Sequence, residues 1–274
     1  VDALLAAGGS GVATLGLPGT SGVPAAAVSE TLVAPFNVVP RLDNSVAAVI
    51  VEPLPANMGL VEPAAGFLEG LRTECDRVGA LLIFDEVISG FRVARGFYQS
   101  RCAVAPDITC FGKVIGGGLP IGAIGGRRDV MEHLSPLGTV FHAGTLAGNP
   151  LATAAGLAAL SLLDDAAYGF MARQARRLGD GLASAFRDAG IPAVVPVVDS
   201  LVGIHLAPRA ATNFDEAKQT DEGVYARFFH AMLDEGVALA PGAYEVLFPG
   251  LAHSDSVIDR IVEAAHRAAR RAAR

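Results

Sequence analysis

The chain has 274 residues, of which 51% are hydrophobic and 18% charged, and its net charge is −7. This length and apolar content can fill a large core, so we expect one large domain and a smaller one. The acidic balance argues against nucleic-acid binding, which needs concentrated Lys and Arg, and the longest nearly uncharged stretch, 108–126, is too interrupted by glycines for a membrane span.

The chain opens on Val1, without an initiator Met, and soon enters a glycine-rich loop. Residues 8–24 hold six glycines and two prolines, too many interruptions for a helix or a long strand. Loops of this kind are often mobile lids over active sites, whereas the frayed end of a truncated chain would have a similar composition. We expect an N-terminal truncation, and composition alone leaves both interpretations of the loop open.

A βαβ unit follows the loop. Residues 46–51 form a continuous apolar run, typical of a strand buried on both faces. Apolar residues then repeat at helical spacing over 67–78, and Gly79 is suited to end that helix. A second buried strand is expected at 80–84, directly before Asp85.

Strands at 108–111 and 121–124 would extend the sheet, and Asn149-Pro150 supplies the cap and first residue of a long helix. The alternation of strands and helices predicts an α/β fold, with a mostly parallel central sheet and helices on both faces. Residues 1–163 would form this large domain.

The pattern changes after about residue 164. Helices are expected around 178–186 and 224–236 and from 254 to the end, with extended segments at 193–206. This order predicts a smaller α+β domain over residues 164–274.

The spacing of cysteines and histidines matches no common metal or disulfide pattern. Cys75, Cys102 and Cys110 form no C-x-x-C pair, and none of the six histidines lies four residues from another. We expect free thiols in the core, no metal site and a reducing, cytoplasmic location.

Lys113 is the candidate for covalent chemistry. The chain has only two lysines among its 21 Lys and Arg residues, and Lys113 sits between apolar neighbours and three glycines. Burial would favour the neutral amine, which can form a Schiff base as arginine cannot. The alternative is a lysine at a strand end that extends to solvent.

Asp85 is the candidate partner, because it ends a buried strand, where open α/β sheets place their ligand sites. A solvated acid at the sheet edge is the alternative. A pyridoxal cofactor needs both a lysine for its aldehyde and a carboxylate for its ring nitrogen, and the two residues together fit that need.

A phosphate site is predicted where Thr145 and several backbone amides precede the helix that starts at Asn149-Pro150. An ordinary capping turn is the alternative. A nucleotide-binding Walker loop does not fit near Lys113, because its glycines would precede the lysine and here they follow it.

Three segments together resemble the class III aminotransferases: FDEVISGFRVA at 84–94, PDITCFGKVIGGGLPIGAIGG at 106–126 and AGTLAGNPLATAAG at 143–156. The resemblance implies a fold type I enzyme in which Lys113 binds the aldehyde of pyridoxal 5'-phosphate and Asp85 its ring nitrogen. It also implies that Val87 packs on the ring and that Thr145 contacts the phosphate of the neighbouring subunit's cofactor. A homodimer with shared active sites would follow.

Three more segments are similar to the aminomutase branch of that family, whose members move an amino group within one substrate on the route to tetrapyrroles. These are residues 9–24, 51–63 and 228–254. The resemblance implies that Ser10 and Glu245 face the substrate, that Asn57 lies near the ring hydroxyl of the cofactor, and that the glycine-rich loop is a lid.

The chain also departs from the family pattern. Leu54-Pro55-Ala56 and Arg101-Cys102 replace residues that are usual there, although neither change removes a catalytic group. The family's first portion, with its carboxylate-binding arginine, phosphate loop and ring-stacking aromatic residue, has no counterpart in this sequence, so we expect the chain alone to be inactive.

Two other functions stay open. An intermolecular aminotransferase for ω-amino acids would need a carboxylate-binding arginine near Tyr244, where the chain has Glu245. A non-catalytic fragment would use only the dimer surface.

Overall fold

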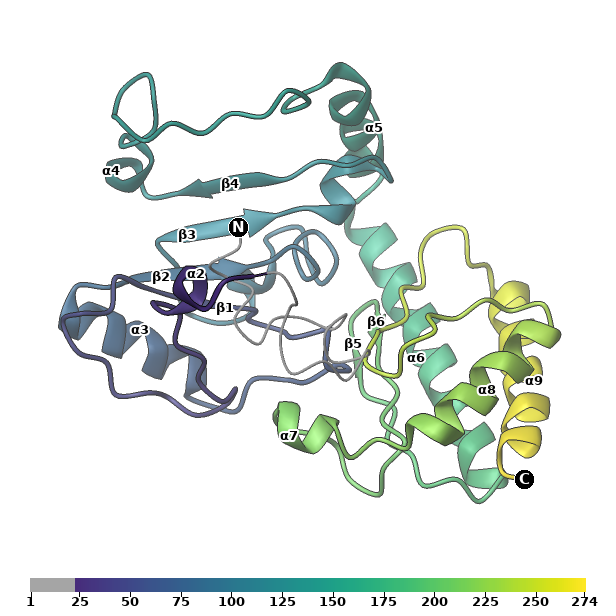
Figure 1. Ribbon diagram of the computed structural model, residues 1–274. Helices are drawn as coiled ribbons and strands as arrows, with labels where there is room; N and C mark the ends of the chain where they lie inside the picture. Colours follow the sequence, from purple (N-terminus) through teal and green to yellow (C-terminus); the bar gives the residue numbers. More distant parts are fainter. Residues whose placement is uncertain (1–22) are drawn as a thin grey trace. The chain divides into compact units, whose positions relative to one another are not determined.

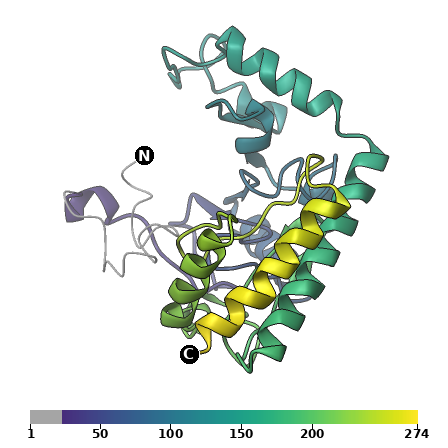
Figure 2. The same ribbon diagram turned by 90° about the vertical axis from the view of Figure 1, so that its right-hand side faces the viewer.

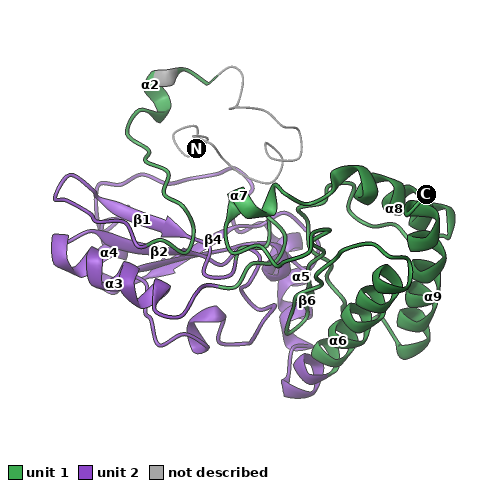
Figure 3. Cartoon of the chain, turned by 90° about the horizontal axis from the view of Figure 1, so that it is seen from below, with its two compact units in different colours: residues 1–38, 55–62, 170–274 green, residues 39–54, 63–169 purple. Residues whose placement is uncertain are grey.

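The computed structural model describes residues 23–274, which divide into two compact units (Figure 3). Unit 2 comprises residues 39–54 and 63–169, and the described part of unit 1 comprises 23–38, 55–62 and 170–274. The first 22 residues, with Ser10 and most of the glycine-rich loop, lie outside the described part.

Unit 2 contains a four-stranded sheet in the order β1-β2-β3-β4, in which β1, β2 and β3 are parallel and β4 is antiparallel to β3 (Figure 1). An α/β fold with a mixed, mostly parallel sheet is therefore confirmed. In chain order, its elements are β1 (Ala48–Val51), α3 (Phe67–Val78), β2 (Leu81–Asp85), η2 (Tyr98–Ser100), β3 (Ile108–Phe111), η3 (Lys113–Gly116), β4 (Ala123–Gly126), α4 (Arg128–Met131), α5 (Pro150–Ser161) and the start of α6 (Asp165–Asp188).

Helix α3 has the predicted bounds, and its sequence explains why. Phe67, Leu71 and Cys75 are buried on the face that packs against β1 and β2. Gly79 then adopts φ 76°, a left-handed conformation that ends the helix and lets its N–H bond to the Cys75 carbonyl.

The sheet is less enclosed than the sequence predicts. In β2, Leu82 and Phe84 are fully buried, but Ile50 in β1 is 46% exposed. β1 is an edge strand, and among the described residues α3 covers only one face of it, so the expectation of a strand buried on both faces is wrong for β1.

Unit 1 is built around three helices that lie next to one another in both ribbon views (Figures 1 and 2). Its elements are α2 (Ala25–Val28), most of α6, β5 (Val197–Val198), β6 (Leu201–Val202), α7 (Phe214–Ala217), α8 (Glu222–Asp234) and α9 (Asp255–Ala272). No helix within residues 23–274 has the length and apolarity needed to cross a bilayer.

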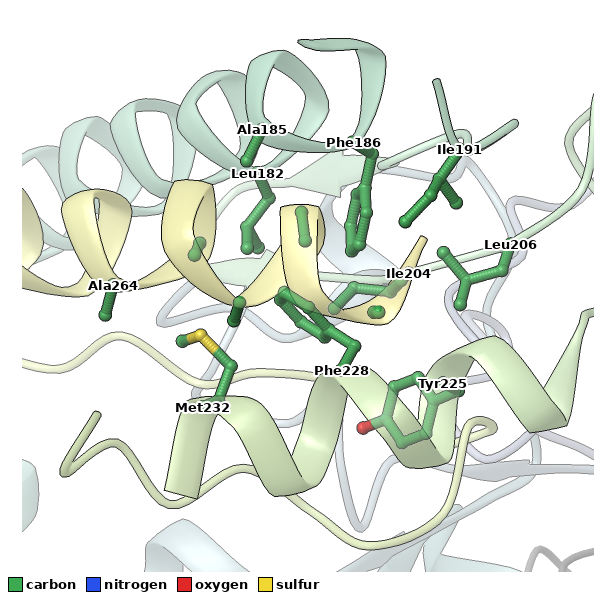
Figure 4. Close-up of a cluster of buried hydrophobic side chains, with 14 of the residues drawn as sticks. Leu182, Ala185, Phe186, Ile191, Ile204, Leu206, Tyr225, Phe228, Met232 and Ala264 are labelled. Atoms are coloured by element: carbon green, nitrogen blue, oxygen red, sulfur yellow. The ribbon is translucent and has the colours of Figure 1, made fainter. Parts of the chain in front are cut away.

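The core of unit 1 forms where α6, α8 and α9 contribute apolar side chains (Figure 4). Phe186 and Phe228 are fully buried, and their ring centroids lie 4.8 Å apart. Each large side chain buried in this way stabilises the fold by about 1.5 to 3 kcal/mol. This core fixes the helices that carry the C-terminal part of the chain.

We expect Phe228→Ala to lower the free energy of unfolding by about 3 to 5 kcal/mol, because it removes a fully buried ring and leaves a cavity. Leu233→Ala in the same helix is the matched control, since Leu233 is 50% exposed, and should change stability by less than about 0.5 kcal/mol. Urea denaturation measures both, and similar losses for the two variants would contradict this assignment of the core.

Candidate active site

The structure brings Asp85 and Lys113 to the same edge of the sheet. Asp85 is the last residue of β2 and pairs with Cys110 of the parallel strand β3. The Glu86 N–H donates to the Cys110 carbonyl at 3.0 Å, which continues the pairing beyond Asp85. Lys113 follows the end of β3 and begins η3. The carboxyl ends of two neighbouring parallel strands thus carry both predicted groups.

Asp85 is oriented by its own turn. Its Oδ1 atom accepts a hydrogen bond from the Val87 N–H at 3.0 Å. Val87 lies against Gly112, where an added Cβ would be 3.2 Å from Val87 Cγ1. The predicted ring-facing valine therefore borders the backbone that leads into Lys113.

Lys113 itself is exposed, so the expectation of a buried amine is wrong for the described structure. Its backbone has φ 47°, an unusual conformation for a residue with a side chain. This left-handed turn leads the chain out of β3, so apolar neighbours in the sequence, such as Val114 and Ile115, do not enclose the amine. Any desolvation of the amine would have to come from groups other than the described residues.

The two lysines differ in their surroundings. Lys218 Nζ lies 2.7 Å from Asp215 Oδ1 and 5.1 Å from the centre of the Phe214 ring. Lys113 has no ion-pair partner among residues 23–274. Lys113 is therefore the lysine left free to react.

The turn that carries Lys113, residues 113–117, packs against α5 through direct backbone contacts at glycines. A Cβ on Gly117 would collide with the Ala155 carbonyl, and a Cβ on Gly156 would collide with the Ile115 carbonyl. The predicted start of α5 is confirmed, since Asn149 Oδ1 accepts the Ala152 N–H at 2.9 Å. α5 thus connects the lysine turn with the loop that precedes Asn149.

Thr145 lies on that loop and is exposed. A turn closes just after it, where the Ala147 N–H donates to the Gly144 carbonyl at 3.0 Å. Apolar neighbours are also exposed, Phe141 by 81% and Leu146 by 72%. The phosphate contact of Thr145 stays a prediction.

Asn57 and Glu245 both belong to unit 1, where a backbone hydrogen bond joins the segments that carry them. The Gly59 N–H donates to the Tyr244 carbonyl at 2.7 Å, which ties the segment carrying Asn57 to the residue before Glu245. Gly59 has φ 76° and lies against the ring of His205, so a side chain would not fit there. The hydrogen bond between Gly59 and Tyr244 thus links the backbone near Asn57 to the backbone next to Glu245.

Two buried tyrosines, Tyr244 and Tyr225, lie close to Glu245. Tyr244 donates from its hydroxyl to Glu222 Oε1 at 2.6 Å, and burial together with this bond raises the pKa of Tyr244 to about 12. Burial and the nearby charge of Glu245 raise the pKa of Tyr225 to about 12. Both phenols are therefore neutral at physiological pH. Neither tyrosine stands out in the sequence from an ordinary core residue.

Glu86 is another supporting residue that no local sequence pattern reveals. Its side chain is fully buried directly after Asp85, and it accepts hydrogen bonds from Ser89, Tyr98 and Gln99. In the sequence it is indistinguishable from a solvated acid, and only the glutamine at position 99 and the serine at 89 offer candidate partners.

The groups at this sheet edge suit the capture of an aldehyde attached to a ring. Lys113 offers an amine, Asp85 an acceptor for a protonated ring nitrogen, and Val87 an apolar surface. Within residues 23–274 no cluster of His, Cys, Asp and Glu is arranged to hold a metal ion.

Comparison with known proteins gives one family and several relatives. Residues 20–269 match the family described as aminotransferase class III. The chain is 49% identical over 272 residues to glutamate-1-semialdehyde 2,1-aminomutase of Desulfosudis oleivorans and 47% identical to that of Desulforapulum autotrophicum. Each alignment covers 96% of this chain but only 64% of the relative, so the chain spans less than two thirds of the length of these curated relatives.

Two solved structures are similar to this chain in their fold. An omega-transaminase from Sphaerobacter thermophilus is similar with a TM-score of 0.87 and 32% identity, over 93% of this chain and 60% of that one. A glutamate-1-semialdehyde-aminomutase from Pseudomonas aeruginosa in complex with PMP is similar with a TM-score of 0.79 and 26% identity, over 91% and 59% of the two chains.

We expect Gly156→Ala to destabilise the protein, although alanine in a helix normally stabilises it by about 1 kcal/mol relative to glycine. The new methyl would collide with the Ile115 carbonyl and displace the lysine turn, at a cost of about 1 to 3 kcal/mol. Gly125→Ala is the control, because a Cβ there meets open space. Thermal denaturation compares the two, and a stabilised Gly156→Ala variant would show that the contact is not tight.

Proposed function

The chain belongs to the class III aminotransferase family, and from this premise we propose that it is the lysine-bearing part of a pyridoxal 5'-phosphate-dependent glutamate-1-semialdehyde aminomutase. The observation that carries the proposal is the register of β2 and β3, which puts Asp85 and Lys113 at one sheet edge. The 47% and 49% identical relatives support the choice of aminomutase within the family.

The residues at the sheet edge fit this cofactor. Asp85 engages Val87 through Oδ1, which leaves Oδ2 to accept from a protonated ring nitrogen. Lys113 has no ion-pair partner among residues 23–274, and Val87 offers methyl groups beside Gly112, the residue before Lys113. When bound, the cofactor supplies an aldehyde that condenses with amines and a protonated ring that withdraws electrons.

Each residue then has a defined task. Lys113 would hold the aldehyde of the cofactor and would move a proton between neighbouring carbons of the substrate at its Nζ atom. Asp85 would keep the ring nitrogen protonated. By the family resemblance, Thr145 would donate to the phosphate, Asn57 would serve the ring hydroxyl, and Glu245 and Ser10 would serve the substrate. The overall reaction converts glutamate-1-semialdehyde to 5-aminolevulinate within one molecule.

An intermolecular aminotransferase is the second candidate, because the omega-transaminase structure fits with the higher TM-score of 0.87, against 0.79 for the aminomutase. The two functions differ in their need for a second substrate. The aminomutase forms 5-aminolevulinate from glutamate-1-semialdehyde without an added keto acid, whereas the transaminase turns over only when an amino donor and an acceptor are both supplied. Assay of the full-length protein under both conditions decides between them.

A homodimer is part of the proposal. Helix α5 and the chain before it, from residue 137, expose large apolar side chains. Leu137 is 80% exposed, Leu151 75% and Leu157 72%. Only Ala152 and Gly156 of α5 are buried, although the helix is apolar on all sides. Such a surface is typical of a protein interface. In such a dimer, the family resemblance implies that Thr145 serves the active site of the neighbouring subunit.

We also propose a cytoplasmic location. Cys75, Cys102 and Cys110 are all free thiols in the structure, which suits a reducing compartment.

In the full-length protein, Lys113→Ala should abolish covalent attachment of pyridoxal phosphate, because no other amine stands at this sheet edge among the described residues. Borohydride reduction followed by mass spectrometry measures the attachment. Lys218→Ala is the matched control and should keep the adduct on Lys113. A cofactor adduct that persists in Lys113→Ala would overturn the assignment.

Shared active sites predict that two defective subunits can complement each other. Lys113→Ala removes the amine, and Thr145→Asp should prevent phosphate binding by charge repulsion. A hybrid dimer contains one site with an intact Lys113 from one subunit and an intact Thr145 from the other. Mixing the two variants should restore cofactor capture on the Thr145→Asp subunits, and no recovery in verified hybrid dimers would mean that each site uses its own Thr145.

A further inference from the structure

We propose that Glu86 is a positioning residue for this site. Its buried carboxylate binds the turn at 97–100 and thereby restricts the position of Lys113. The inference rests on the proposed function, since it assigns Lys113 as the reacting amine. Asp85 and Glu86 are successive residues at the end of a strand, so their side chains leave the chain in opposite directions. Glu86 therefore acts behind the site and does not contact ligand.

Both carboxylate oxygens of Glu86 are engaged. Oε2 accepts from the Tyr98 N–H at 2.7 Å and the Ser89 hydroxyl at 3.1 Å, and Oε1 accepts from Gln99 Nε2 at 3.0 Å. The backbone N–H can only donate, and Gln99 donates here through its Nε2 group, so the side chain is bound as an acceptor at both oxygens. A fully buried carboxylate held in this way fixes its partners strongly.

Gln99 extends the anchor to the next strand. Its Nε2 atom donates both to Glu86 and, at 2.9 Å, to Thr109 Oγ1 in β3. The turn is thus bound to the end of β2 and to β3 at the same time, and Lys113 follows directly from β3.

The anchor also explains an unusual backbone. Phe97 adopts φ 61° and ψ −173°, a region that is costly for any residue except glycine. Its neighbour Tyr98 supplies the N–H that Glu86 binds. The strained conformation is therefore held by a buried hydrogen bond one residue away.

Phe97 connects the turn at 97–100 with the end of β3 through ring packing. Its ring centroid lies 4.7 Å from that of Phe91 and 4.7 Å from that of Phe111. Phe111 is the last residue of β3, and only Gly112 separates it from Lys113. A loosened turn at 97–100 would remove the packing that holds Phe111, and the amine would sample a wider range of positions.

The test uses Glu86→Leu, which keeps most of the side-chain volume but removes both acceptor oxygens that the Tyr98 N–H and Gln99 Nε2 bind. In the full-length protein, we expect covalent capture of pyridoxal phosphate at Lys113 to slow by at least about tenfold, and amides 97–101 to exchange hydrogen faster in the cofactor-free protein. Glu86→Gln is the conservative variant and should keep most of the capture rate and of the protection from exchange, because its amide oxygen can accept from the Tyr98 N–H while Gln99 turns its own amide to accept from the new NH₂ group. Gln99→Ala should slow capture in the same direction if Glu86→Leu does not fold.

Asp107→Asn is the matched control. The Asp107 carboxylate is also buried, with 3% exposure against 0% for Glu86. It binds Arg72 and Arg127 at the opposite end of β3. Its loss should lower thermal stability but leave the capture rate of folded protein unchanged. Equal slowing by Asp107→Asn, or as much slowing by Glu86→Gln as by Glu86→Leu, would overturn the positioning role. Failure of the wild type to capture the cofactor at Lys113 would instead overturn the proposed function, whereas the exchange of amides 97–101 would still test the anchor.

Discussion

The parallel pairing of β2 with β3 is the constraint on which the site depends. It sets Asp85 opposite Cys110, so that the residues following both strands emerge at one edge. Because side chains alternate along a strand, a shift of one residue would turn Asp85 to the other face of the sheet and bring Glu86 to the site. The full burial of Leu82 and Phe84 on the other face of β2 opposes such a shift. The same strand register therefore determines which side chains are buried in the sheet and which ones lie at its functional edge.

The predicted site residues that the structure describes are half-buried or exposed, whereas the residues that hold them are fully buried. Asp85, Asn57 and Glu245 are partly accessible and Lys113 is open to solvent. Their supports, which include Glu86, His205 and Tyr244, have at most 3% exposure. This division suits an active site, because groups that must meet a ligand stay accessible and their positions are set by buried hydrogen bonds.

The sequence predicts what depends on local pattern and fails where distant contacts decide. Helix α3 and the cap at Asn149 follow from spacing and capping chemistry, and the structure has both at the predicted residues. β4 starts two residues later than expected, because the stretch of small residues around Gly122 gives no sharp boundary. The exposure of Lys113 depends on a left-handed backbone, and the role of Glu86 depends on partners that reach it only after folding.

The scarcity of lysine has a consequence for the chemical selectivity of the protein. A free aldehyde in the cell condenses with accessible primary amines, which attack its carbonyl carbon, and most proteins offer many such amines. This chain has only two lysines, and the amine of Lys218 is occupied by Asp215 and lies near the Phe214 ring. Arginine carries the remaining positive charge and does not form such adducts under the same conditions. Few side chains in this chain therefore compete with Lys113 for an aldehyde, so a carbonyl probe would label it with little background.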